Sequence, residues 1–382
     1  MAVDRVGPEN AAGFAAGSGT APVAEGSRRG AKHFVVLDGL RGIAALAVVA
    51  MHAGDQFGLK FAPRHAYLAV PFFFMLSGFV IGHAYEDGIM RSRSVASFAR
   101  VRIERLYPML IVSLVVALAI TIGFYRRPAA DVSLLALAAI VMVPVPGANA
   151  FPLIPPQWSL CVEIYGNLIH RAVVERLTTP RLVGLLVVAL ASMMLVAWDD
   201  GGLAGGWRLS TLGQAGAIFG FCYGLGVLIY RQHRQGTLPR WRLPFGAIVV
   251  LLVTTFLLPI RLETRANAAA DVASASLVYP LIIISSLSLG ESRWIAAVMN
   301  ALGRLSYPLY ILHYPLILLA GDLARDRLAG RRLAEYGAAA AMVIASTALA
   351  WLVLVWIDEP WRRAIRDCQR AGAKLRASTR SD

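Results

Sequence analysis

The sequence predicts an all-α membrane protein, a polytopic bundle of about ten transmembrane helices. Of its 382 residues, 57% are hydrophobic and only 16% are charged, whereas soluble domains carry about a quarter charged residues. The mean hydropathy is +0.61, and one soluble core could not bury so much apolar surface. Lys and Arg number 37 against 23 Asp and Glu. That excess suits basic loops against an anionic bilayer better than a nucleic-acid-binding domain, so no nucleic-acid partner is expected.

Eleven apolar runs follow one another along the chain, and ten of them are predicted spans. The ten cover residues 35–53, 66–85, 106–125, 158–172, 182–198, 209–230, 244–260, 272–290, 305–320 and 334–357. The eleventh, 132–146, is short and runs straight into a Pro-rich segment. A span needs about 20 residues, so this run is expected to be re-entrant or interfacial.

The distribution of basic residues predicts the orientation of the chain. Segments expected inside hold 25 of the 37 Lys and Arg residues, outer loops hold 11, and Arg41 lies in the first span. This excess places both termini in the cytoplasm. Residues 1–33, rich in Gly, Ala and Ser, are expected to form a disordered cytoplasmic tail. Residues 34–360 then form the membrane domain, and residues 361–382 form a basic cytoplasmic tail.

The first predicted span, "LDGLRGIAALAVVAMHAGDQ" (37–56), carries Asp38, Arg41 and His52. Arg41 and His52 are 11 positions apart. On a helix this is about 20° past three turns and about 16 Å along the axis, so both lie on one face, with Asp38 nearby. A charge deep in a bilayer costs at least ~2.5–3.5 kcal/mol, so this stripe should face protein or water. Alternatively, Asp38 and Arg41 form an interfacial pair, and His52 merely caps the outer end.

A second segment, "SFARVRIERLYPML" (97–110), precedes the third span on the predicted inner side. It brings together Arg100, Arg102 and Arg105. These residues could simply anchor the topology, or they could clamp a phosphate, because Arg forks bind phosphate bidentately and a helix N-terminus attracts anions.

A third segment, "PPQWSLCVEIYGN" (155–167), places Trp158 at the predicted interface and Glu163 inside a span. Ser159, Glu163 and Asn167 recur every four residues and share a face. Glu163 is expected at about the depth of His52, which suggests a general-base pair. The alternative is a hydrogen-bonded Glu that fixes helix packing.

A fourth segment, "LGRLSYPLYILHYPL" (302–316), carries Ser306, Tyr310 and His313 on one helical face. Aromatic packing around a satisfied core histidine is as compatible with this pattern as a binding role. The three cysteines are far apart and show no metal-ligand spacing, so no metal site is predicted.

Taken in order, these segments and "FFFMLSGFVIG" resemble the acyltransferase-3 family of integral membrane O-acyltransferases, which includes bacterial O-antigen and exopolysaccharide acetylases. The resemblance covers roughly residues 35–360. The family's Arg-x10-His pair is matched by Arg41 and His52, and its R-x-x-R motif by Arg102 and Arg105.

The family's W-S-L-x-x-E pattern is matched by Trp158, Ser159 and Glu163. The acid that usually follows this Glu is replaced by Ile164, which puts a paired-carboxylate role in doubt. Together with Asp38 and His313, Trp158 and Ser159 are expected to support the site.

The resemblance implies transfer of an acyl group, expected to be acetyl, from cytoplasmic acyl-CoA to a hydroxyl of a glycan or other acceptor. It implies a multi-pass protein of the bacterial inner membrane, with acyl-CoA as co-substrate and no bound cofactor. Arg102 and Arg105 would hold the donor phosphates, and Arg41 would steady the donor. His52 would take the acceptor's proton or carry the acyl group, and Glu163 would orient His52.

Two other classes of function fit the polar stripe. In a transporter of a glycan or small anion, the stripe would be a translocation path. In a non-catalytic partner of a polysaccharide assembly complex, His52 would be dispensable. Acyl transfer by the purified protein separates the enzyme from the transporter.

Overall fold

The computed structural model describes residues 34–86, 94–290, 292–365 and 367–368, and it is all-α, with no strand in these ranges. The predicted tail 1–33 and residues 369–382 of the basic tail lie outside them. The α-helices are α1 (Val35–Gln56), α2 (Ala69–Ile81), α4 (Val95–Leu118), α5 (Ala129–Ile140), α6 (Gln157–Val173), α7 (Thr179–Asp200), α8 (Leu212–Gln235), α9 (Phe245–Phe256), α10 (Arg265–Ala273), α11 (Tyr279–Ser286), α12 (Arg293–Leu328) and α13 (Arg332–Val353).

Eight helical stretches among the described residues are long and apolar enough to cross a membrane, which confirms the predicted polytopic helical fold. They are Val35–Gln56, Ala66–Glu86, Val95–Phe124, Thr179–Asp200, Leu209–Gln235, Arg265–Ser286, Arg293–Leu328 and Arg332–Ile365. The other two predicted spans correspond to α6 and α9, which have 17 and 12 residues. The run 132–146 forms α5, of 12 residues, which is too short for a span.

The two ends of the bundle are defined by contacts between distant segments. At one end, here called the arginine end, Arg231 near the end of α8 pairs with Glu86, which follows α2. At the opposite end, the Phe256 carbonyl that closes α9 accepts a hydrogen bond from the backbone of His65. Because α8 finishes at the arginine end, α9 must traverse the bundle to reach His65. The predicted spans at α6 and α9 are thus shorter than the other eight, and α9 ends beside the segment that precedes α2.

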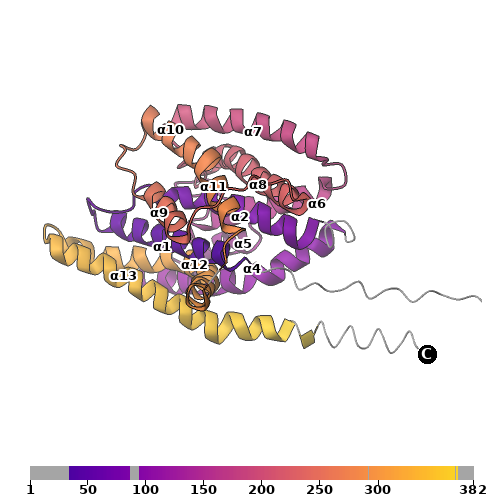
Figure 1. The fold of residues 1–382 in the computed structure, drawn as a ribbon. Coiled ribbons are helices and arrows are strands. Elements are labelled where there is room, and N and C mark those ends of the chain that lie inside the picture. Colours follow the sequence, from indigo (N-terminus) through magenta and orange to yellow (C-terminus); the bar gives the residue numbers. More distant parts are fainter. Residues whose placement is uncertain (1–33, 87–93, 291, 366, 369–382) are drawn as a thin grey trace, which may run out of the picture. The chain divides into compact units, whose positions relative to one another are not determined.

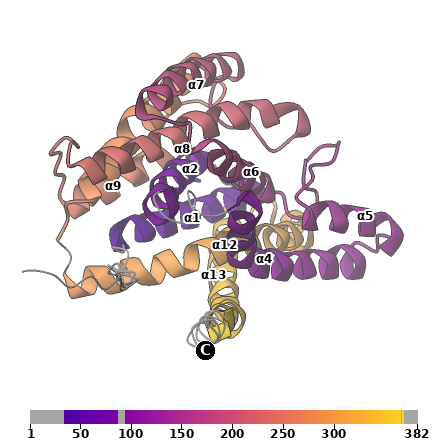
Figure 2. The ribbon, with the colours of Figure 1, turned by 90° about the vertical axis from the view of Figure 1, so that its right-hand side faces the viewer.

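Helix α1 lies among α12, α13, α2 and α9, and α7 and α13 lie on opposite sides of it (Figures 1 and 2). Its contact with α12 is close because both helices carry glycines there. A Cβ on Gly42 would lie 2.4 Å from the Leu302 carbonyl oxygen, and one on Gly303 would lie 2.6 Å from the Cβ of Asp38. Small residues let helix backbones approach in membranes, and this approach brings the polar face of α1 onto α12.

Helices α2 and α8 are joined by a second close contact. A Cβ on Gly78 would lie 2.0 Å from the Tyr223 carbonyl oxygen, and one on Gly226 would lie 2.1 Å from the Met75 carbonyl oxygen. Each glycine thus faces the other helix's backbone, which cannot move aside as a side chain can.

We expect Gly78→Ala to destabilise the protein by at least 1–3 kcal/mol, about the cost of overpacking a tight core. The control is Gly216→Ala on α8, where a Cβ would meet nothing within 4 Å, so alanine's better helix propensity should keep or raise stability. Thermal unfolding in detergent compares the two. Equal melting temperatures for both variants would contradict the close contact.

A buried polar network joins the loops at the end opposite the arginine end. Asn267 accepts a hydrogen bond from His65 Nε2 at 2.7 Å and donates to the Gly201 carbonyl at 2.8 Å. One turn later, Asp271 accepts from the Tyr67 hydroxyl at 2.8 Å. Burial lowers the pKa of His65, and its hydrogen bond to Asn267 opposes that effect. The network ties the segments before α2, after α7 and on α10 together.

Candidate functional site

Arg41 is held between α1 and α12. Its Nη2 lies 3.1 Å from Asp38 Oδ1, the predicted i,i+3 pair. Its Nε also donates to Ser306 Oγ at 2.9 Å, and Nη2 donates to the Gly303 carbonyl at 3.3 Å. The guanidinium is therefore held against protein atoms of both α1 and α12.

Glu163 forms an ion pair with Arg102, which differs from the expectation that it orients His52. Arg102 Nη2 lies 2.8 Å from Glu163 Oε1, and Ser77 Oγ donates to the same oxygen at 2.7 Å. The Arg102 side chain is only 4% exposed. A buried guanidinium needs a counter-charge, and α4 carries Arg102 within reach of α6. The structure thus assigns Glu163 to the arginine site.

Arg105, one turn beyond Arg102 on α4, lies within electrostatic range of Arg102, Arg41 and Arg362. Asp38 neutralises Arg41, and Glu163 neutralises Arg102. In the part of the chain that the structure describes, no carboxylate lies within ion-pair distance of Arg105. Arg362 pairs with Asp358, so Arg105 is the one group of these four whose charge no described carboxylate neutralises. This arrangement favours binding of a phosphate-bearing anion.

His52 packs directly against His313. The two rings are stacked, with centroids 5.3 Å apart and planes inclined by 22°, and Tyr314 contacts His52 edge-on at 5.0 Å. His313 is fully buried, and its Nδ1 lies 3.1 Å from the Leu309 carbonyl oxygen. A carbonyl can only accept, so Nδ1 of His313 donates and its tautomer is fixed. His313, left open by the sequence, thus joins the site as the direct neighbour of His52.

Tyr310 connects the histidine pair with the Trp158–Glu163 segment. Its hydroxyl is 2.8 Å from Ser159 Oγ, and its ring lies 6.1 Å from that of His313. Trp158 packs edge-on against Phe74 of α2 at 6.5 Å. Ser159 therefore lies near the histidine level, and Glu163, one turn further along α6, lies nearer the arginine level.

Ser77, Tyr314 and a second buried ion pair were not predicted from the sequence. Ser77 could have been noticed as a hydroxyl within "FFFMLSGFV", and it contacts Glu163. The second pair joins Arg231 and Glu86, with Nε 2.8 Å from Oε1. It fastens the ends of α2 and α8 together and takes no part in the chemistry proposed below.

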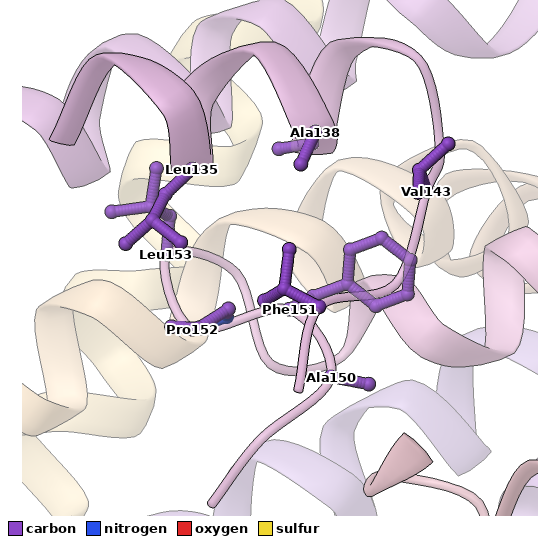
Figure 3. Close-up of a pocket in the computed structure, with 9 residues that line it drawn as sticks. Leu135, Ala138, Val143, Ala150, Phe151, Pro152 and Leu153 are labelled. Atoms are coloured by element: carbon purple, nitrogen blue, oxygen red, sulfur yellow. The ribbon is translucent and has the colours of Figure 1, made fainter. Parts of the chain in front are cut away.

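A small apolar pocket lies between α5 and the loop that follows it (Figure 3). It has about 170 Å³ of empty space and is lined by residues such as Leu135, Val143 and Phe151. Small-molecule sites present convergent polar groups, and this lining has no titratable side chain. In the described ranges, no three His, Cys, Asp or Glu side chains gather as metal ligands either. The candidate site is therefore the polar face of α1.

The geometry defines a membrane protein with two chemical levels on one helix. Arg41 marks an arginine level near the arginine end, and His52 marks an imidazole level about 16 Å further along α1. Because Arg41 meets Ser306 and His52 meets His313, α1 and α12 run parallel and together carry both levels.

A family model described as an acyltransferase domain matches residues 34–355, and the chain therefore belongs to the acyltransferase-3 family of membrane acyltransferases. This confirms the resemblance inferred from the motifs. The chain is also similar to "Protein 2 in picA locus" of Rhizobium radiobacter. The two are 32% identical over 184 residues, which cover 44% of this chain and 95% of that protein. No solved structure matches the chain.

Proposed function

We propose that this membrane acyltransferase moves an acetyl group from cytoplasmic acetyl-CoA to a hydroxyl of a glycan or another acceptor. One observation carries the proposal: the arginine cluster and the histidine pair lie at two levels of the same face of α1. A CoA donor is negatively charged at its nucleotide end and reactive at its thioester end. A protein that binds the nucleotide end and reacts with the thioester end needs a cationic site and a basic site, separated along one path.

At the arginine level, Arg105 binds the donor's diphosphate, because its charge is not consumed by a carboxylate of the described chain. Arg102 contributes a fixed positive charge whose position is set by Glu163. Arg41, anchored on α12, steadies the donor where its arm enters the bundle. The proposed orientation places this level on the cytoplasmic side of a bacterial inner membrane, with both termini cytoplasmic.

At the histidine level, His52 accepts the proton of the acceptor hydroxyl while the hydroxyl oxygen attacks the thioester carbonyl. The C–O bond forms, the C–S bond breaks, and the proton passes from His52 to the departing CoA thiolate. His313 stacks on His52 and holds the ring in place through its own bond to the Leu309 carbonyl. The scheme needs neutral imidazole and no metal or bound cofactor. A variant of it has His52 carry the acetyl group briefly.

Purified protein incubated with acetyl-CoA tests the proposal through release of the CoA thiol. Turnover in nanodiscs that is absent from empty discs supports an acyltransferase. A transporter or a scaffold has no reason to cleave a thioester, so no release under any acceptor condition would favour those classes.

We expect Arg105→Ala to raise the KM for acetyl-CoA on the order of tenfold, with a smaller effect on kcat, because a phosphate contact is lost. Arg105→Lys should recover part of the loss, because it keeps the charge but not the bidentate fork. The control is Arg100→Ala on the same helix, where Arg100 is 82% exposed and pairs with Glu104. Unchanged donor binding by Arg105→Ala would reduce Arg105 to a topology anchor.

A further inference from the structure

The segment after α13 is docked beside the arginine level. The helical turn Leu354–Asp358 contacts both α4 and α12. The next residue, Glu359, forms an ion pair with Arg304 of α12. Arg304 adjoins Gly303, whose carbonyl accepts a hydrogen bond from Arg41. The segment expected to begin a cytoplasmic tail is therefore folded against the site at this point.

This segment carries Arg362, which belongs to the same group of arginines as Arg41, Arg102 and Arg105. Arg362 pairs at 2.7 Å with Asp358, the last residue of the turn that contacts α4, the helix that carries Arg102 and Arg105. The Asp358 side chain is 1% exposed, so the ion pair holds the guanidinium of Arg362 in a fixed position. The Arg362 side chain itself is 37% exposed, against 27% for Arg41 and 4% for Arg102. Arg362 is thus the most exposed of these three guanidinium groups.

The order of the chemical groups in CoA matches the order in which these arginine side chains become more exposed. If the thioester reaches His52, the donor enters with its acyl group deepest, followed by the pantetheine arm, the diphosphate and the 3′-phosphorylated ribose. The diphosphate then lies near Arg105, and the ribose phosphate lies further out. Like charges crowded around Arg105 also repel one another, so a further anion beside Arg362 lowers that repulsion.

We propose that Arg362 forms a subsite for the 3′-phosphate of the CoA donor. The inference rests on the proposed function and adds a residue from outside the motifs of the sequence. It assigns the C-terminal segment a role in distinguishing CoA from nucleotides that lack this phosphate.

The test measures binding of CoA and of 3′-dephospho-CoA to the full-length protein in nanodiscs. We expect the wild-type protein to bind CoA about 5- to 10-fold more tightly, the range for one partly exposed charged contact. Arg362→Gln should weaken CoA binding to the level of dephospho-CoA and leave dephospho-CoA binding unchanged. Glutamine keeps a hydrogen-bond donor for buried Asp358, and thermal unfolding verifies the fold.

The matched control is Arg363→Gln, which removes the same charge one position away from a side chain that is 68% exposed. It should retain the wild-type preference. An Arg362→Gln protein that keeps the preference, or that loses affinity for both ligands equally, overturns the 3′-phosphate assignment. If the wild-type protein binds neither ligand, the donor itself is wrong, and the proposed function fails with it.

Discussion

His52→Ala is expected to lower the rate of acyl transfer on the order of 10²–10⁴-fold, the usual contribution of a general acid–base residue. The fold should survive, because the ring of His52 contacts mainly His313 and Tyr314 and makes none of the close backbone contacts that join α1 to α12. The measurement is the initial rate of CoA release at saturating acetyl-CoA, together with the melting temperature of the same sample.

Two further variants test whether the loss of activity comes from the missing imidazole base. His52→Gln keeps most of the side-chain volume without a base, so it should be as inactive as His52→Ala. His233→Ala, on a histidine near the end of α8 that packs against Phe34 and Phe79, should retain activity. Near-normal transfer by His52→Ala would remove His52 from the chemistry.

Glu163→Gln is expected to destabilise the protein by about 3–5 kcal/mol, the cost of leaving one partner of a buried ion pair without its counter-charge. Arg102, at 4% exposure, cannot turn to water, and Ser77 would lose its charged acceptor. Thermal or denaturant unfolding of the detergent-solubilised protein measures the change. Isosteric glutamine leaves the packing of α6 nearly unchanged, so the loss reports on charge.

A double-mutant cycle identifies the partner of Glu163. The Arg102→Gln/Glu163→Gln protein should be more stable than the sum of the two single losses predicts, since the buried charge is removed with its counter-charge. The parallel cycle of Glu163→Gln with His52→Ala should be additive in stability. Coupling to His52 in place of Arg102 would restore the base-orienting role that the sequence suggested for Glu163.

The sequence predicted what depends on composition and helical periodicity. Long apolar runs gave the all-α membrane class, and the 11-residue spacing placed Arg41 and His52 on one face. The eight long helices confirm the first of these predictions. Helix α9 is shorter than its apolar run 244–260 suggested, because Pro244 and Pro259 flank it and helix ends depend on tertiary packing.

Contacts between distant segments could not be predicted from the sequence. Glu163 and His52 have similar predicted depths, but depth says nothing about rotation of α6 around its axis or about the reach of the Arg102 side chain. Arg362 lies in what composition alone describes as a basic tail. The ion pair between Glu359 and Arg304, and the contacts of the turn Leu354–Asp358 with α4 and α12, show that its segment returns to the site.

Mass spectrometry of surface glycans tests the central claim most directly. A strain that lacks this protein would be complemented with the wild-type chain, with His52→Ala or with Arg100→Ala, each at matched expression. We predict that the wild type and Arg100→Ala restore an ester-linked acetyl group that the deletion removes, and that His52→Ala does not. Full restoration of that ester by His52→Ala would contradict acyl transfer at the histidine level of α1.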